Sequence, residues 1–207
     1  INLRLQDNSV PATFASDIKP TWDNSLGMDA VLYEDDYLAT SEGVKLPSLK
    51  SFRKSQDRLA SISKHKSARN KGSTHRASDK SRRQLAKKEA KLHQKIARAR
   101  KDHAYNTAQA LLNTGKKVFF HEKLNLAGLS RRNKTKTDET GKFLPNGQSS
   151  SSGLNKSWAD AAFGQFFNIL KFKAEKAGAL VIPVNPQYTS QLLPYKDEFI
   201  FTNTSIR

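Results

Sequence analysis

Two acidic residues in apolar segments are the strongest candidates for chemistry in this chain. Asp29 lies within the run Gly27-Met-Asp-Ala, and Glu122 ends the run Phe119-Phe-His-Glu. An acid among buried hydrophobic residues is costly unless it is paired, hydrogen-bonded or bound to a cation. Carboxylates that neighbouring strands project to one edge of a sheet suit Mg²⁺, and two such ions can bind the attacking and leaving oxygens of a phosphodiester displacement. The pair therefore predicts a metal site for phosphodiester chemistry.

A simpler interpretation remains open, in which each acid pairs with a local base such as Lys123 or His121. His121 is not favoured as a general base, because it directly precedes Glu122 and side chains alternate between the two faces of a strand. The other histidines lie in or beside the basic segment without metal-ligand spacing, so we expect them to be solvated or to contact phosphate: His65, His75, His93 and His103.

Basic residues are concentrated in one quarter of the chain. The sequence has 36 lysines and arginines against 19 acidic residues, a formal net charge of +17 at pH 7. Nineteen of the basic residues but only three of the acidic ones lie between Lys50 and Lys101. An internal, helix-periodic block of this kind favours a nucleic-acid partner over a solvated helix face or a disordered basic tail. The candidate nucleic-acid contacts are Lys64, Lys66, Arg69, Lys71, Arg76, Arg82, Arg83, Lys87, Lys88, Lys91, Lys95 and Arg98.

The apolar pattern predicts strands and helices that alternate along the chain. The expected strands are one near Ile1, then 26–32, 37–40, 44–46, 116–122 and 179–184. Helices are expected from Ser48, along the stripe Leu85, Leu92, Ile96 and Ala99, and as one amphipathic helix from Trp158 to Ala174. Residues 63–81 and 130–152 lack a period, so the first is expected to be a loop or to order on binding, and the second to be a long mobile loop. This layout predicts an α/β fold with a mixed sheet.

Composition also bounds the class of protein. Without cysteine, the chain has no disulfides, thiol nucleophile or cysteine-ligated zinc. No apolar run approaches the ~18–20 residues of a membrane span, and the N-terminus lacks a secretory signal pattern. We therefore expect an intracellular protein with no membrane partner and no small-molecule substrate. Because the chain starts at Ile1, we expect it to be a fragment or a processed form.

Several short segments, in order, resemble the TnpB (OrfB) proteins of bacterial insertion sequences, which are relatives of the type V CRISPR nucleases. They are Gly27-Met-Asp-Ala, the basic helix with Leu85-Ala-Lys-Lys and Leu92-His-Gln-Lys-Ile-Ala-Arg-Ala-Arg-Lys-Asp, His121-Glu-Lys-Leu-Asn, Gly153-Leu-Asn-Lys-Ser, Phe172-Lys-Ala-Glu-Lys-Ala-Gly and Asn185-Pro-Gln-Tyr-Thr-Ser-Gln. The resemblance runs from about Gly27 to the end of the chain.

This resemblance implies a RuvC-like RNase H fold and an RNA-guided DNA endonuclease associated with transposition in the bacterial cytoplasm, near the nucleoid. It implies Mg²⁺ as cofactor, DNA and a guide RNA as partners, and Asp29 and Glu122 as the first two catalytic acids and metal ligands. The implied domains are the end of a β-rich domain and a linker (1–26), the nuclease domain (27–190) and a zinc-knuckle remnant without its cysteines (191–207). Within the nuclease domain, residues 48–112 are the basic helical segment.

The sequence departs from the family pattern at its C-terminal end. Leu193 and Lys196 stand where the family has the first cysteine pair, so zinc is not expected. The third catalytic aspartate is expected beyond Arg207, so the fold is expected to be incomplete at the C-terminus. Three functions stay open: an incomplete nuclease, a catalytically dead RNA- or DNA-binding module descended from it, and a basic structural protein. The third explains the charge but not Asp29 and Glu122.

Overall fold

The structure, a computed structural model, describes residues 18–69 and 76–186. Its strands are β1 (Ser25–Ala30), β2 (Asp36–Thr40), β3 (Lys45–Pro47), β4 (Val118–Glu122), β5 (Lys136–Thr137), β6 (Phe143–Leu144) and β7 (Leu180–Val184). Its helices are α1 (Ser51–Ala68), α2 (Arg76–Leu112), α3 (Leu126–Leu129), α4 (Gln148–Ala161) and α5 (Phe163–Lys176). The strand expected near Ile1 and the zinc-knuckle remnant expected at 191–207 lie outside the described residues. None of the described helices is long and apolar enough to cross a membrane.

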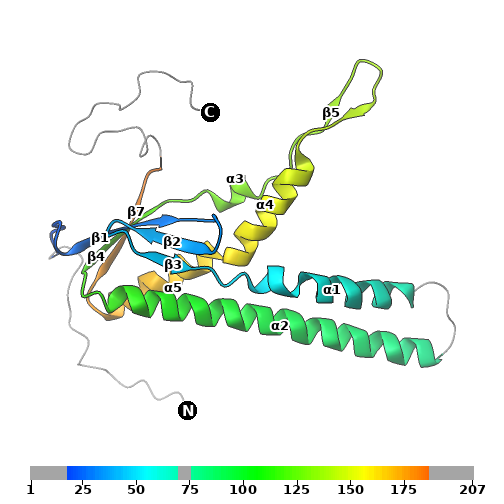
Figure 1. The fold of residues 1–207 in the computed structure, drawn as a ribbon, viewed down its shortest axis with the longest axis horizontal. Helices are drawn as coiled ribbons and strands as arrows, with labels where there is room; N and C mark the ends of the chain where they lie inside the picture. The colour runs from blue at the N-terminus through cyan, green and yellow to red at the C-terminus, as the bar shows by residue number, and fades with distance from the viewer. Residues whose placement is uncertain (1–17, 70–75, 187–207) are drawn as a thin grey trace, which may run out of the picture.

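A five-stranded sheet in the order β3-β2-β1-β4-β7 forms the body of the protein (Figure 1). β1, β4 and β7 run parallel to one another, whereas β2 runs antiparallel to both β1 and β3. The central parallel strand β4 begins with Val118 and Phe119, which are both fully buried. The mixed sheet with flanking helices confirms the expected α/β class and is consistent with an RNase H-like fold.

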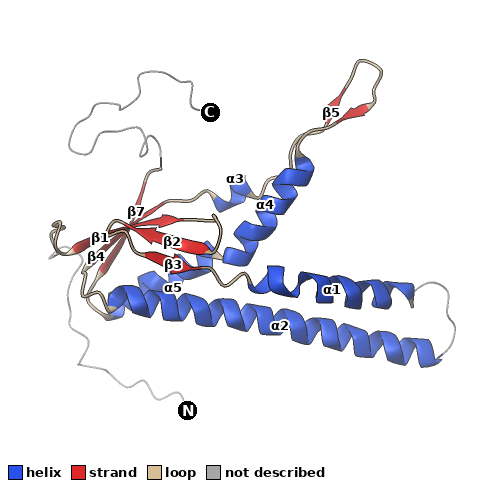
Figure 2. Ribbon diagram, in the orientation of Figure 1, coloured by secondary structure: helices blue, strands red, loops and turns tan. Residues whose placement is uncertain are grey.

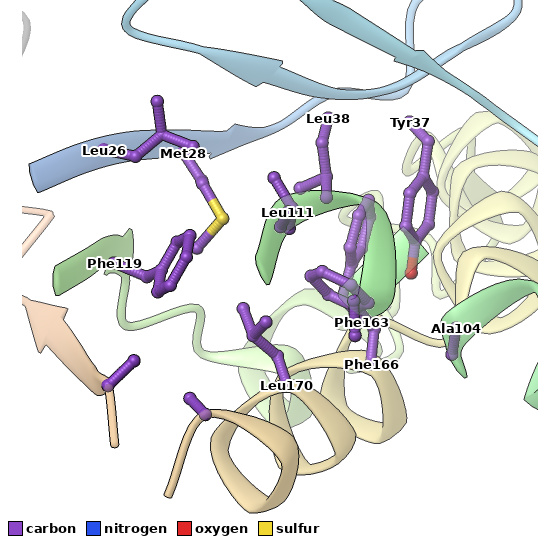
Figure 3. Packing of buried hydrophobic residues seen from close by; sticks show 13 residues of the cluster. Leu26, Met28, Tyr37, Leu38, Ala104, Leu111, Phe119, Phe163, Phe166 and Leu170 are labelled. Atoms are coloured by element: carbon purple, nitrogen blue, oxygen red, sulfur yellow. The ribbon is translucent and has the colours of Figure 1, made fainter. Parts of the chain in front are cut away.

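The hydrophobic core lies between the sheet and two helices, α2 and α5. In Figure 3, Leu26, Met28 and Phe119 of the sheet point toward Leu111 of α2 and Leu170 of α5. Beside them, the ring of Tyr37 stacks on that of Phe163, with 4.7 Å between centroids. The Tyr37 hydroxyl donates a hydrogen bond to the carbonyl of Ala161 (3.1 Å), and burial raises the pKa of the phenol. This core fixes both helices on one face of the sheet.

α1 and α2 lie side by side as a helical arm that extends well beyond the sheet (Figure 2). The predicted apolar stripe of α2 faces α1: Ile96 is buried, and Leu85, Leu92 and Ala99 are half-buried. The expectation of a loop over residues 63–81 is wrong for most of that segment, because α1 continues to Ala68 and α2 already begins at Arg76. This segment has no apolar stripe, but contacts between the two helices stabilise it, among them an ion pair between Lys66 of α1 and Glu89 of α2.

The single helix expected from Trp158 to Ala174 is in fact two helices. α4 ends at Ala161, and Ala162 adopts a left-handed conformation with φ 52° before α5 begins at Phe163. The break lets α5 pack along the sheet while α4 leaves it at an angle (Figure 1). Left-handed backbone is unusual for a residue other than glycine, so nothing in the sequence marked this position.

Residues 130–152, expected to be an aperiodic loop, contain regular structure. β5 and β6 form a small hairpin that projects beyond the N-terminal end of α4 (Figure 1). α4 itself begins at Gln148. The turn is organised by Asp138, whose carboxylate accepts hydrogen bonds from the backbone N–H groups of Thr140 and Lys142 at 2.9 Å each. The hydrogen bonds from Thr140 and Lys142 lower the pKa of Asp138. A side chain bonding its own turn is a local device that hydrophobic periodicity does not detect.

Candidate metal and nucleic-acid sites

The two candidate acids lie at the same level on neighbouring parallel strands. Met28 of β1 is paired with His121 of β4, and Asp29 and Glu122 are the next residue on each strand. Adjacent strands are about 4.8 Å apart, and residues at matching register point to the same face. Asp29 and Glu122 therefore share the face opposite the helices α2 and α5.

The surroundings of Asp29 differ from those expected. Its neighbour Met28 points into the core, but Asp29 itself is exposed, and Glu122 is half-buried. Burial therefore imposes no cost on the Asp29 carboxylate, contrary to the expectation from the sequence. What distinguishes the pair is its placement on one sheet face.

The donor set fits a weakly held Mg²⁺ ion. Mg²⁺ usually keeps several waters and is bound through one or two carboxylates together with substrate phosphates. Asp29 and Glu122 supply two carboxylates. Across residues 18–69 and 76–186, no group of three or more aspartate, glutamate or histidine side chains is placed to hold one metal ion. In this part of the chain the pair thus offers two carboxylates as candidate ligands.

His121 lies on the other side of the sheet from the two acids. Its ring stacks on Phe167 of α5 with centroids 3.9 Å apart, and Nδ1 lies 2.8 Å from the carbonyl oxygen of Glu122. Burial lowers the pKa of His121. The expectation that His121 points away from Glu122 agrees with this geometry, and the ring packs against the core.

Most of the predicted nucleic-acid contacts are exposed along the arm. The exposed members are Lys64, Arg69, Arg83, Lys87, Lys88, Lys91, Lys95 and Arg98. Arg82 and Lys66 are half-buried, and the ion pair of Lys66 with Glu89 joins the two helices of the arm. Lys71 lies outside the described residues, and Arg76 is the first residue of α2.

Two other arginines of the basic block bind within the protein. The Arg100 guanidinium lies 3.0 Å from a carboxylate oxygen of Asp160, whose side chain is only 3% exposed. Arg53 donates to the Ser157 hydroxyl (2.9 Å) and to the carbonyl of Gly153 on α4. These two arginines therefore attach the arm to α4.

Asp160 is a structural residue that the sequence analysis missed. Its carboxylate accepts hydrogen bonds from the backbone N–H groups of Phe52 (2.8 Å) and Arg53 (2.9 Å) at the first turn of α1. The preceding residue, Lys50, provides no side-chain cap for this helix. Asp160 thus caps α1 from a distant part of the chain, and a negative charge at a helix N-terminus is favourable. Because Asp160 and the start of α1 are more than 100 residues apart, no pattern in the sequence indicated this contact.

One protein-family model matches part of this chain. Residues 163–198 match the family model described as Cas12f1-like, TNB domain. The match covers α5 and β7 and continues beyond the described residues. A comparison with curated proteins found no match. The family match supports a relationship between this chain and the TnpB and Cas12 families.

Proposed function

We propose that the chain is a nucleic-acid-binding part of a TnpB-like, RNA-guided DNA endonuclease. The observation that carries this proposal is the match of residues 163–198 to the Cas12f1-like TNB domain. The match includes α5, which packs on the sheet, and β7, the strand at one edge of the sheet. The TnpB-like segments found in the sequence extend over the rest of the expected nuclease domain.

The arm is the proposed contact with the nucleic-acid backbone. α2 has 37 residues and is therefore about 55 Å long at 1.5 Å per residue. Exposed lysines and arginines recur along it, whereas its apolar stripe is used against α1. Phosphate contacts of this kind position a protein on nucleic acid without reading its sequence. Specificity would then come from the guide RNA.

Asp29 and Glu122 are the proposed ligands of Mg²⁺. When bound, Mg²⁺ would activate water and stabilise charge on the oxygens of the scissile phosphate. The two carboxylates would bind and orient the ion on the open face of the sheet. Their roles in catalysis rest on the family resemblance and on their common level on β1 and β4.

A second function is favoured by one observation. The described residues hold no three-ligand metal group, so the chain could bind RNA or DNA without cutting it. The two functions share the arm and differ in the metal site.

The arm proposal is tested by a matched pair of charge reversals. In the arm variant, Lys87→Glu and Lys91→Glu change two exposed lysines of α2; in the control, Lys136→Glu and Lys142→Glu change two exposed lysines of the β5–β6 hairpin. We expect the wild-type affinity for a duplex to fall with salt at a log–log slope of about −0.9 per phosphate contacted. The arm variant should bind at least about 10-fold more weakly at ~0.1 M salt and show a shallower slope, because it has lost phosphate contacts. Equal losses in the two variants, or an affinity that does not depend on salt, would contradict the proposal.

A further inference from the structure

A pocket lies on the same face of the sheet as Asp29 and Glu122. Its volume is about 540 Å³, and the loop before β1, the strands β1 and β4 and the turn after β2 line it. Gly27 and Phe120 form adjacent parts of the lining and are directly paired across β1 and β4. Asp29 and Glu122 follow two residues later on the same strands, about 7 Å away at the usual rise of a strand. The pocket and the carboxylate pair are therefore parts of one surface.

Trp22 gives the pocket an aromatic wall. Its side chain is 77% exposed, the most exposed of the large hydrophobic residues in the described part of the chain. A concave site lined in part by aromatic side chains is typical of a ligand pocket. The half-buried ring of Phe120 belongs to the same lining.

The floor of the pocket is backbone whose polar groups are already bonded. The Gly27 N–H donates to the Ser41 hydroxyl (3.1 Å), and the Gly27 carbonyl accepts from the Ser41 N–H (2.9 Å). The acidic residue of the lining, Glu42, forms an ion pair with Lys116 at 2.7 Å. The pocket thus offers aromatic surface with little uncompensated negative charge, which suits a flat ring attached to an anionic chain.

We infer that this pocket holds one unstacked base of a nucleic-acid strand, against Trp22, while the neighbouring phosphate of that strand lies beside the Mg²⁺ that Asp29 and Glu122 would hold. The inference rests on the proposed function and adds a positioning residue to it. Base–aromatic stacking tolerates any base, because every base has a π-face. A base inside a duplex is already stacked, so the pocket selects an unpaired strand.

Fluorescence of Trp22 tests the inference directly. The chain has two tryptophans, and Trp158→Phe leaves Trp22 as the only tryptophan. We expect a single-stranded oligothymidine to quench this emission saturably, and a duplex of the same length to quench it much less. Quenching that instead follows protein concentration without oligonucleotide would assign the pocket to a second copy of the chain. Emission unchanged by oligonucleotide, despite measured binding, would exclude a base from the pocket. Either result overturns the inference.

Affinity measurements in the otherwise unaltered chain provide the second test. Trp22→Ala should weaken binding of the single strand about 10-fold, and Trp22→Phe should restore most of it, since a phenyl ring also stacks on a base. Phe143→Ala removes an exposed aromatic residue of β6 and should change nothing. If Trp22→Ala binds normally while the Lys87 and Lys91 reversals weaken binding, the inference is wrong and the proposed function stands. If the unaltered chain binds no oligonucleotide, both are wrong.

Discussion

At the scale of single residues, Asp160 has the clearest structural role. Its side chain is almost completely buried and meets the first turn of α1 and the guanidinium of Arg100 at once. A buried carboxylate is tolerated only where hydrogen bonds and an opposite charge replace its water. Asp160 therefore fixes where the basic arm leaves the body of the protein.

Replacing Asp160 should be strongly destabilising. Asp160→Ala leaves Arg100 without its buried partner and the start of α1 without its cap, so we expect a loss of about 3–5 kcal/mol in the free energy of unfolding. Urea unfolding followed by circular dichroism measures this loss. The matched control is Asp57→Ala, an exposed aspartate on α1, expected to change stability by less than about 0.5 kcal/mol. Similar values for the two variants would show that the buried network contributes little.

At the scale of elements, the junction between α4 and α5 decides how the helices are arranged. Ala162 closes α4 by donating its N–H to the Trp158 carbonyl, and its own carbonyl accepts from the N–H of Phe166 in α5. Its left-handed conformation turns the chain between these two helices. α5 can then place Phe163, Phe166 and Leu170 in the core.

Because of this junction, we expect replacement of alanine by glycine to affect stability differently at two nearby positions, 162 and 159. Ala162→Gly should leave stability unchanged or raise it by up to about 1 kcal/mol, because the left-handed conformation strains an alanine but not a glycine. Ala159→Gly, in the helical part of α4, should lower stability by about 1 kcal/mol. Thermal and urea unfolding of both variants measure the difference. A larger loss at residue 162 than at residue 159 would argue against a left-handed junction.

At the scale of the whole molecule, the nucleic acid is proposed to contact two places, the arm and the sheet face that carries Asp29 and Glu122, and the metal site decides whether the nucleic acid is cut. Two-metal phosphodiester cleavage needs enough oxygen ligands to hold both ions and offset their charge. Asp29 and Glu122 supply two carboxylates, and the described residues add no third ligand at one site.

We expect two carboxylates alone to hold the metal ions too weakly for cleavage at a significant rate, while nucleic-acid binding is retained. The measurement is a Mg²⁺-dependent nicking assay with a guide RNA supplied, in which the unaltered chain and Asp29→Ala should both be inactive. Binding should stay intact in both proteins. Nicking that disappears in Asp29→Ala would contradict the expectation and would require a third ligand from elsewhere in these residues.

The sequence by itself determined the properties that depend on local pattern. Apolar runs around Leu26, Phe119 and Val181 predicted the parallel strands of an α/β fold, and the stripe through Ile96 predicted the inner face of α2. The basic block could be counted directly, and the positions of Asp29 and Glu122 on two apolar strands were visible without any structure. Periodicity and charge are properties of neighbouring residues, so they can be recognised before the chain folds.

Only the tertiary structure decided how distant residues meet. In the structure Asp29 is exposed and Asp160 is buried. α1 and α2 extend into the segment that was expected to be a loop, and the expected single helix is divided at Ala162. The structure also brought Trp22 over the same sheet face as the carboxylate pair. Strand register, desolvation and capping across more than 100 residues depend on contacts that have no fixed spacing in the sequence, which is why local patterns could not predict them.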